Sequence, residues 1–287
     1  MQLVEAYARA VDILRDAGID SFTSNARLIL MDLTGVDENI FFTGGAGPEL
    51  SDETQRILWN RIKRRADGEP LELVLGWTYF FDSKFFIEPG VFNPRPDTEV
   101  LVEHALEYLQ SVEGEGPLSC MDLCCGSGVV GLSVALSDER VRLISTDISA
   151  DAVALTRRNI EYHDLEDRAR AEQTDLYPEE HTHDGLCALI LANPPYISRE
   201  EGLKLPREVV DYDPPSSLYG GEDGLDPHRR ILERLPEFLR KGGAVMMEIG
   251  WKQGDASRKV FESAGLSSVQ IFDDYAGHSR VATGVLP

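Results

Sequence analysis

Residues 122–131 read DLCCGSGVVG, with the pattern Gly-x-Gly-x-x-Gly directly after an apolar segment that is typical of a β-strand. Glycines at these positions let the backbone approach a ligand closely, and a helix that begins after them offers free N–H groups. Asp147 ends the next predicted strand, 21 residues after Gly126, where a carboxylate can accept hydrogen bonds from ribose hydroxyls. The stretch therefore predicts a ribose-bearing cofactor, without deciding between a nicotinamide dinucleotide and other cofactors of this kind.

Strands alternate with helices from residue 98 onward. The segments between the first five strands are long enough for crossover helices, which predicts a parallel sheet covered on both faces. The last two strands have no helix between them, so we expect them to pair antiparallel. The fold class is therefore α/β and Rossmann-like. The seven predicted strands are Ser119–Leu123, Val141–Asp147, Ala169–Asp175, Cys187–Asn193, Ala244–Gly250, Ser267–Asp274 and Arg280–Val285.

The fourth predicted strand runs into the tetrapeptide Asn193-Pro194-Pro195-Tyr196. In a parallel sheet this tetrapeptide lies at the carboxyl edge, beside the crevice that the glycine-rich stretch predicts. Because prolines lack an N–H group, the Pro194 carbonyl is not drawn into a helix and can accept a hydrogen bond from a ligand, as can the Asn193 side-chain oxygen. With the ring of Tyr196 as a flat wall, these acceptors suit a planar group that bears NH₂, such as a side-chain amide or the exocyclic amine of a base.

Residues 1–73 are predicted to be helical. Apolar residues recur at three- and four-residue steps over 3–14, and further helices are expected at 24–33 and from Ser51 onward. The third of these helices ends in the basic cluster Lys63–Arg65. This cluster either complements the helix dipole or forms a docking surface for an acidic partner, and the sequence leaves both interpretations open.

Residues 74–97 are predicted to form an extended linker with a β-hairpin. Its aromatic residues are typical of short strands, with the turn expected at Asp82-Ser83. The prolines of the Pro-Arg-Pro sequence at 94–96 fix the backbone and prevent a helix there. Residues 98–287 form the third predicted part of the chain.

Composition sets limits on the class of protein. The chain has 287 residues, of which 42% are apolar and 27% charged, so it can build a core. Its four cysteines include no Cys-x-x-Cys pair, which argues against a zinc ribbon or disulfide scaffold and favours the cytoplasm. No apolar run approaches the ~20 residues that cross a bilayer, and the first residues lack the basic segment of a signal peptide. The net charge of −22 repels duplex DNA, so we expect neither a stable nucleic-acid partner nor a membrane partner, and we expect a monomer.

Together these motifs resemble one family, the release factor glutamine methyltransferases (PrmC/HemK), within the class I S-adenosylmethionine-dependent methyltransferases. The resemblance covers nearly the whole chain. Beyond the glycine-rich stretch and Asn193–Tyr196, the matching stretches are Arg64–Pro70 with Leu75-Gly76, Pro94–Glu99, Gly220–Asp226, Glu248–Gly250 with Gln253-Gly254, and Arg280-Val281.

The resemblance implies a helical N-terminal substrate-recognition domain, a hairpin linker and a seven-stranded methyltransferase domain. It implies methyl transfer from S-adenosyl-L-methionine to the side-chain amide nitrogen of the glutamine in the Gly-Gly-Gln motif of peptide chain release factors, with S-adenosylhomocysteine as the product. Asn193, Pro194, Pro195 and Tyr196 would hold the glutamine and act in catalysis. The residues expected to meet the cofactor are Cys124, Cys125, Gly126, Ser127, Gly128, Asp147, Leu176 and Asn193, together with Asp175, which can reach the adenine amine. Members of the family often have glycine at the position of Cys124.

Four other functions are weaker alternatives. An enzyme that methylates the amine of a nucleic-acid base could use Asn193–Tyr196 in the same way, to hold a planar group that bears NH₂. Such an enzyme must also neutralise phosphates, whereas residues 1–80 carry 8 basic and 13 acidic groups and are therefore net negative. A ribosomal-protein glutamine methyltransferase is closer, although Pro94–Glu99 favours release factors. A nicotinamide dehydrogenase has no use for the Asn-Pro-Pro-Tyr sequence, and a non-catalytic interaction module would not bind the cofactor.

Several other residues have a weaker chemical interpretation. The segment 213–216 (Asp-Pro-Pro-Ser) repeats part of the tetrapeptide but follows no apolar strand, so we predict a loop. His181 and His183 flank an acidic turn and could form a metal pair, but we expect no metal. The two adjacent cysteines are expected to pack beside the glycine-rich stretch. Glu99 and Glu248, like Asp175, are expected near the edges of the pocket.

Overall fold

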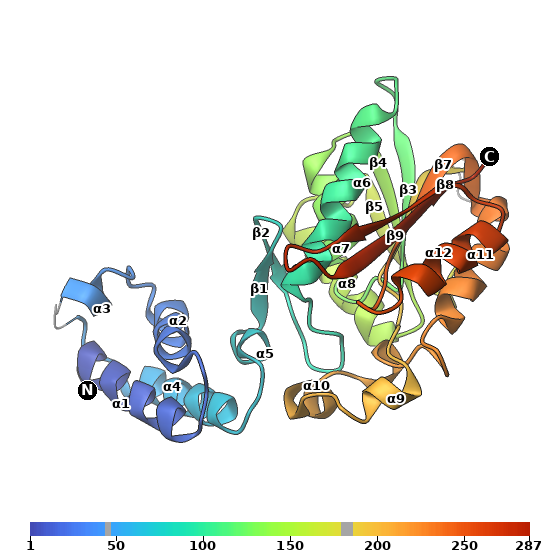
Figure 1. The fold of residues 1–287 in the computed structure, drawn as a ribbon. Coiled ribbons are helices and arrows are strands. Elements are labelled where there is room, and N and C mark those ends of the chain that lie inside the picture. Colours follow the sequence, from blue (N-terminus) through green and yellow to red (C-terminus); the bar gives the residue numbers. More distant parts are fainter. Residues whose placement is uncertain (44–46, 179–185) are drawn as a thin grey trace. The chain divides into compact units, whose positions relative to one another are not determined.

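The computed structural model describes all residues except 44–46 and 179–185 (Figure 1). The chain divides into two compact units, Met1–Thr78 and Tyr79–Pro287. Because this division falls inside the predicted linker 74–97, the three-part division of the chain stays a prediction.

The first unit is helical, and the three helices expected from its sequence are α1, α2 and α4. Their buried faces form its core, which includes Leu14, Ile29 and Leu58. At the start of α4, the Ser51 hydroxyl accepts a hydrogen bond from the Thr54 N–H at 3.1 Å and so caps the helix. The helices of this unit are α1 (Leu3–Asp16), α2 (Phe22–Thr34), α3 (Ile40–Thr43), α4 (Asp52–Ala66) and α5 (Leu71–Leu75).

Two residues of the basic cluster at the end of α4 are bonded within this unit. Arg64 donates two hydrogen bonds to the Glu69 carboxylate and one to the Leu73 carbonyl, the last at 3.0 Å. Arg65 donates to the side-chain oxygen of Asn25 at 2.6 Å and to the Glu69 carbonyl at 2.8 Å. These contacts tie the end of α4 to α5 and α2, so both arginines have a structural role.

The hairpin consists of β1 (Trp77–Phe80) and β2 (Ser83–Phe86). Phe81 and Asp82 form its turn, with φ angles of 46° and 61°. The turn expected at Asp82-Ser83 is therefore wrong by one residue. Positive φ at both central positions is the requirement of a type I′ two-residue hairpin turn, and Phe81 and Asp82 meet it. Ser83 already belongs to β2.

The second unit is built on a seven-stranded sheet in the order β5-β4-β3-β6-β7-β9-β8. As the sequence predicts, strands β3–β7 pair parallel, and β8 and β9 pair antiparallel with each other. The structure adds that β9 also pairs antiparallel with β7. All seven predicted strands occur. Their bounds are β3 (Leu118–Leu123), β4 (Val141–Asp147), β5 (Ala169–Gln173), β6 (Cys187–Ala192), β7 (Leu239–Glu248), β8 (Ser267–Asp273) and β9 (Ser279–Val285).

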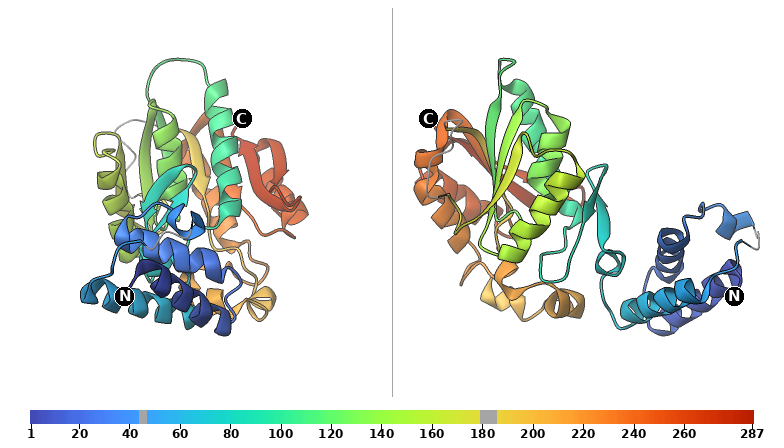
Figure 2. Two further views of the ribbon diagram at one scale, coloured as in Figure 1. Left: turned by 90° about the vertical axis from the view of Figure 1, so that its left-hand side faces the viewer. Right: turned by 180° about the vertical axis from the view of Figure 1, so that it is seen from behind.

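Helices cover both faces of this sheet (Figures 1 and 2). Cys120 of β3 packs with residues of α6, α7 and α8, whereas the next residue, Met121, packs with residues of α11 and α12. In the described part of the chain, no helix is both long and apolar enough to cross a bilayer. The helices of this unit are η1 (Pro96–Thr98), α6 (Glu99–Ser111), α7 (Val129–Ser137), α8 (Ala150–Tyr162), α9 (Arg199–Gly202), α10 (Arg207–Tyr212), η2 (Pro215–Ser217), α11 (Asp226–Phe238) and α12 (Gly254–Ser263).

One buried amide joins the hairpin to the loop between β3 and α7. Asn159 of α8 is fully buried. Its side-chain oxygen accepts a hydrogen bond from the Phe86 N–H at 2.8 Å, and its NH₂ group donates to the carbonyls of Phe86 at 3.2 Å and Ser127 at 2.9 Å. The second strand of the hairpin and the glycine-rich loop are thus held by the same side chain.

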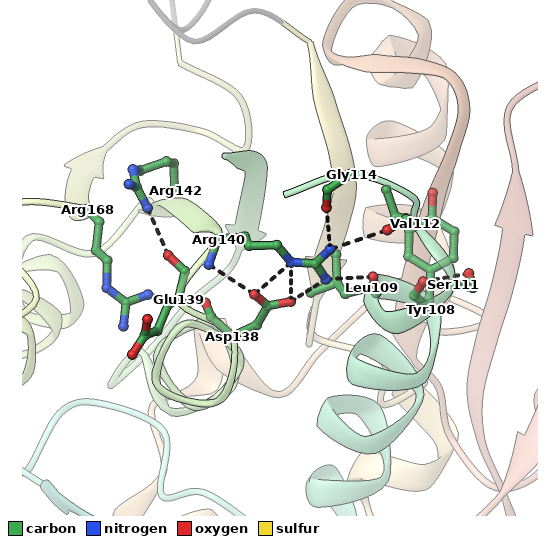
Figure 3. Close-up of polar contacts among 10 residues, drawn as sticks. All are labelled: Tyr108, Leu109, Ser111, Val112, Gly114, Asp138, Glu139, Arg140, Arg142 and Arg168. Atoms are coloured by element: carbon green, nitrogen blue, oxygen red, sulfur yellow. Dashed lines mark hydrogen bonds and ion pairs between the residues drawn. The ribbon is translucent and has the colours of Figure 1, made fainter. Parts of the chain in front are cut away.

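At the amino edge of the sheet, Arg140 directly precedes β4 (Figure 3). Its guanidinium group donates hydrogen bonds to the carbonyls of Leu109, Val112 and Gly114 and to the Asp138 carboxylate. Carbonyls at the end of a helix lack partners within that helix. Arg140 therefore completes the end of α6, at the edge of the sheet opposite the strand ends described next.

Candidate active site

A cavity of about 350 Å³ lies at the carboxyl edge of the sheet, where β3, β4 and β6 end. This volume falls within the range of ~300–1,000 Å³ of small-molecule sites. Gly128 and Pro194 are not among its lining residues. The predicted site residues that line it are Cys124, Cys125, Gly126, Ser127, Asp147, Asp175, Leu176, Asn193, Pro195 and Tyr196.

The glycine-rich stretch forms a tight turn between β3 and α7. Cys124, Gly126 and Gly128 have left-handed φ angles of 58°, 57° and 81°. A non-glycine residue adopts this conformation at a cost of roughly 1–2 kcal/mol, so the turn keeps a glycine-like shape at Cys124. At Gly128, a Cβ atom would lie 2.8 Å from the Thr156 side chain. This glycine therefore serves the packing of the loop onto α8.

The Asp147 carboxylate holds this loop from the end of β4. One carboxylate oxygen accepts a hydrogen bond from the Gly126 N–H and the other from the Ser149 N–H, each at 2.9 Å. A carboxylate has about four acceptor positions, so capacity remains toward the cavity. Burial raises the pKa of Asp147 above its ordinary value.

Asp122 also lines the cavity, and the sequence interpretation missed its role. It is 1% exposed near the end of β3, and its carboxylate accepts a hydrogen bond from the Gly131 N–H at 3.0 Å. Burial, reinforced by the negative charge of Asp147, raises the pKa of Asp122 to about 7. An ionisable residue inside an otherwise apolar strand, just before a ligand-binding loop, is the signal that could have identified it.

The tetrapeptide after β6 presents Asn193 and Tyr196 to the cavity. Among the described residues, the Asn193 side chain makes no hydrogen bond. The Tyr196 hydroxyl donates to the Glu248 carboxylate at 3.0 Å. Burial, followed by the charge of Glu248, raises the pKa of Tyr196, and burial raises that of Glu248. The phenol therefore keeps its proton and the ring is fixed by this hydrogen bond.

The predicted loop 213–216 overlaps a regular element only at the single turn η2 (Pro215–Ser217), but the segment does more than connect two elements. Pro214 and Ser216 line the cavity. The buried Asp213 carboxylate accepts a hydrogen bond from the Asn93 N–H at 3.1 Å and forms an ion pair with Arg95 at 2.5 Å. These contacts hold the wall of the cavity against the Pro-Arg-Pro loop.

The three carboxylates expected at the pocket edge have different positions. Asp175 lines the cavity and forms a half-exposed ion pair with Arg230 of α11 at 2.7 Å. Glu248 lies behind Tyr196 rather than on the lining. Glu99 is not on the lining either, although the preceding residue, Thr98, is. The Glu99 carboxylate accepts a hydrogen bond from the Phe81 N–H at 3.0 Å and so stabilises the hairpin turn.

Of the two adjacent cysteines, Cys125 is buried and packs beside the glycine-rich loop as expected, whereas Cys124 is only partly buried. The Cys125 sulfur lies 3.4 Å from the Thr156 hydroxyl. Burial raises the pKa of both thiols far above the ordinary value, so neither is activated as a nucleophile. No group of three or more side chains suited to hold a metal occurs in the part of the chain that the structure describes, and His181 and His183 lie outside it.

The charges of the cavity fit a cationic cofactor with a ribose. The acidic side chains of Asp147 and Asp175 line it together with that of Asp122, whose raised pKa keeps it partly protonated near neutral pH, and the one cationic lining residue among those described, Arg230, is paired with Asp175. S-adenosylmethionine carries a sulfonium and an ammonium group beside its ribose. The seven-stranded sheet with this cavity at its carboxyl edge defines a class I S-adenosylmethionine-dependent methyltransferase.

Comparisons with known proteins narrow this class. The family described as "PrmC N-terminal domain" matches residues 5–76, and "Methyltransferase small domain" matches residues 83–211. The release factor glutamine methyltransferase of Clostridium acetobutylicum is 32% identical over 285 residues, covering 99% of both chains. That of Agrobacterium fabrum is 34% identical over 271 residues, covering 94% of this chain and 92% of the relative. The chain belongs to the family of release factor glutamine methyltransferases.

A solved structure agrees with the fold. The 16S rRNA N2 G1207 methyltransferase of T. thermophilus, in complex with AdoMet and guanosine, has a TM-score of 0.53 at 18% identity. The match covers 74% of this chain and 50% of that chain. At this identity the similarity extends to the fold alone.

Proposed function

We propose that this protein methylates the side-chain amide nitrogen of the glutamine in the Gly-Gly-Gln motif of peptide chain release factors. The observation that carries the proposal is Asn193, whose side chain lines the cavity and makes no hydrogen bond among the described residues. Its oxygen is therefore free to accept a hydrogen bond from a substrate N–H. The similarity to release factor glutamine methyltransferases over nearly the full chain supports the same substrate.

The chemistry must overcome the low nucleophilicity of an amide. The nitrogen lone pair is delocalised into the carbonyl, by the same resonance that gives peptides a rotation barrier of roughly 18–20 kcal/mol. The Asn193 side chain and the Pro194 carbonyl each accept one N–H of the glutamine, which holds the nitrogen in place and returns electron density to it. The bound cofactor supplies a methyl group on a positively charged sulfur. The substrate nitrogen would gain this methyl group while S-adenosylhomocysteine is left as the product, and the nitrogen would then lose its extra proton to water.

Tyr196 orients the amide in this reaction. Its ring forms a flat wall of the cavity, and the hydrogen bond from its hydroxyl to Glu248 holds the hydroxyl end of the ring in place. A reacting nitrogen must lie about 3–3.5 Å from the methyl carbon and in line with the breaking bond. Tyr196 therefore limits the planar amide to one orientation, and Pro195 extends the same wall.

The cofactor is assigned to the loop after β3 and to the ends of β4 and β5. Asp147 accepts the ribose hydroxyls with the acceptor positions that Gly126 and Ser149 leave available. Leu176 packs against the adenine. The remaining residues assigned to the cofactor are Cys124, Cys125, Ser127, Gly128, Asp175 and Asn193.

For the whole protein, we assign release factor recognition to residues 1–73, the connection to residues 74–97 and catalysis to residues 98–287. The protein acts as a monomer in the cytoplasm. The net charge of −22 supports the absence of a stable nucleic-acid partner.

The test is transfer of labelled methyl from S-adenosylmethionine to a purified release factor. A release factor with alanine in place of the Gly-Gly-Gln glutamine and duplex DNA serve as parallel acceptors. Label on the wild-type factor alone is expected. Label on DNA, or equal label on the alanine variant, would contradict the proposal. In the enzyme, Asn193→Ala should abolish transfer while calorimetry still detects cofactor binding, and near-full activity in this variant would refute the role of Asn193.

A further inference from the structure

Gln253 is a buried side chain that none of the roles above uses. It lies at the N-cap of α12 and is 8% exposed, yet its side chain makes no hydrogen bond to its own helix. Its NH₂ group donates to the carbonyls of Tyr196 at 2.9 Å and Asp223 at 3.0 Å, and its oxygen accepts from the Gly250 N–H at 2.7 Å. One amide thus joins the tetrapeptide, the loop at 220–225 and the end of β7.

Two glycines bring the loop at 220–225 against the same carbonyls. A Cβ atom at Gly220 would lie 2.5 Å from the Pro195 carbonyl oxygen, and one at Gly224 would collide with the Tyr196 carbonyl oxygen. Real Cβ atoms essentially never approach this closely. The Pro195 and Tyr196 carbonyls are therefore closely packed by the backbone of these two glycines, and at the Tyr196 carbonyl the Gln253 amide lies beside Gly224.

Backbone pairing continues this packing one residue further. The Ile197 N–H donates to the Leu218 carbonyl at 2.9 Å, and the Gly220 N–H donates to the Ile197 carbonyl at 3.0 Å. Asn193 directly follows β6, and Ile197 is held by these two backbone bonds. In the stretch between them, the contacts of Gln253 and of the two glycines fix the peptide groups of Pro195 and Tyr196. Those peptide groups determine the direction of the Pro194 carbonyl, because they follow it in the chain.

We propose that Gln253 is a positioning residue for methyl transfer, which holds the carbonyl groups after Pro194 and thereby keeps the Pro194 carbonyl and the Asn193 amide aligned on the substrate nitrogen. This inference rests on the function proposed above. Gln253 is not on the cavity lining, and its side-chain hydrogen bonds all go to backbone groups of Tyr196, Asp223 and Gly250, so we assign it an effect through the tetrapeptide. Loss of its two donated hydrogen bonds lets the tetrapeptide shift, and a displacement of about 1 Å at a reacting centre can cost on the order of 100-fold in rate.

Two variants separate the donors from the acceptor. Gln253→Met keeps the size of the side chain and removes all three hydrogen bonds. Gln253→Glu keeps an oxygen for the Gly250 N–H but places a second oxygen against the two carbonyls. We expect both variants to lower kcat on the order of 100-fold and to change cofactor affinity less than twofold. Arg140→Ala is the matched control, because it removes hydrogen bonds of the same domain at the opposite edge of the sheet and should lower the melting temperature without lowering kcat.

A second measurement needs neither cofactor nor substrate. Hydrogen exchange followed by mass spectrometry should show faster exchange of the Ile197 and Gly220 amides in both Gln253 variants, and unchanged exchange there in Arg140→Ala. A wild-type-like kcat in Gln253→Glu would overturn the inference. Unchanged exchange at these two amides would also overturn it. The exchange measurement still tests the inference when a variant is too unstable for the activity assay. If the wild-type enzyme does not methylate a release factor, the proposed function fails, and the exchange result still tests whether Gln253 holds the tetrapeptide.

Discussion

Replacing Asp122 with asparagine should remove the pH dependence that titration of Asp122 adds to the unfolding free energy of the second unit, Tyr79–Pro287. In the folded protein, burial raises the pKa of Asp122 from 3.8 to about 7. Between these two values the unfolded chain has lost a proton that the folded chain keeps. A raised carboxyl pKa means that the folded state favours the protonated, neutral form of Asp122. The stabilisation that this form gives is complete below about pH 4 and is lost as the pH rises toward 7.

The size of the effect follows from the slope of about 1.4 kcal/mol per pH unit for one proton. From pH 5 to pH 7, the wild-type unfolding free energy should fall by roughly 2 kcal/mol relative to that of Asp122→Asn, because the slope halves as the pH reaches the folded-state pKa of about 7. Asparagine keeps an oxygen that can accept the Gly131 N–H, which Asp122 binds at 3.0 Å. Other titrating groups are common to both proteins, so they cancel in this difference.

The assay is urea unfolding at a series of pH values, with hydrogen exchange of the β3 amides as the reporter of this unit. Asp274→Asn is a control of opposite sign. Hydrogen bonding, first from the His278 N–H, lowers the pKa of Asp274, so its stabilising effect is lost as the pH falls rather than as it rises. Parallel curves for the wild type and Asp122→Asn from pH 5 to 7 would refute the assignment of a raised pKa to Asp122.

Three further substitutions test the site and its frame. Asp147→Ala removes the acceptor of the Gly126 N–H and of the ribose hydroxyls. Calorimetry should show cofactor binding weakened at least tenfold, since hydrogen bonds to charged groups contribute about 1.5–3 kcal/mol. Unchanged affinity would contradict this role. Gly224→Ala places a Cβ atom against the Tyr196 carbonyl and should reduce methyl transfer on the order of 100-fold, a result that full activity would exclude. Arg140→Ala removes the hydrogen bonds of the guanidinium group to the carbonyls of Leu109, Val112 and Gly114 and should lower the melting temperature by a few degrees in calorimetry. An unchanged melting temperature would show that water replaces the arginine.

Much of the sheet could be predicted because each strand leaves a local pattern. The apolar run before Asn193 and the carboxylate at Asp147 mark the ends of two strands. Because the strands pair parallel, both ends are expected at the carboxyl edge of the sheet. The hairpin turn was misplaced by one residue, since Phe81 is not a residue type that usually adopts a positive φ. A favourable contact from Glu99, 18 residues away, helps to stabilise that turn, and no local pattern reveals such a contact.

The cavity could be predicted only on the side formed by the glycine-rich loop and the tetrapeptide. The segment 213–216 was identified as a loop, but its place in the wall depends on the pairing of Asp213 with Arg95, 118 residues away in the sequence. Gln253 contacts Tyr196 across 57 residues. Both contacts form only in the tertiary structure, so neither could be predicted from composition or from the spacing of residues in the sequence.

The hydrogen bonds of Asn159 limit how freely parts of this enzyme can be exchanged with those of its relatives. A hairpin taken from another member of the family would meet an amide already bound to the glycine-rich loop through Ser127, and it must present the N–H and C=O of Phe86 at the same place. The hairpin is therefore not an interchangeable module. A chimera should carry α8 together with β2, because the two elements share one set of hydrogen bonds and define a common exchange boundary.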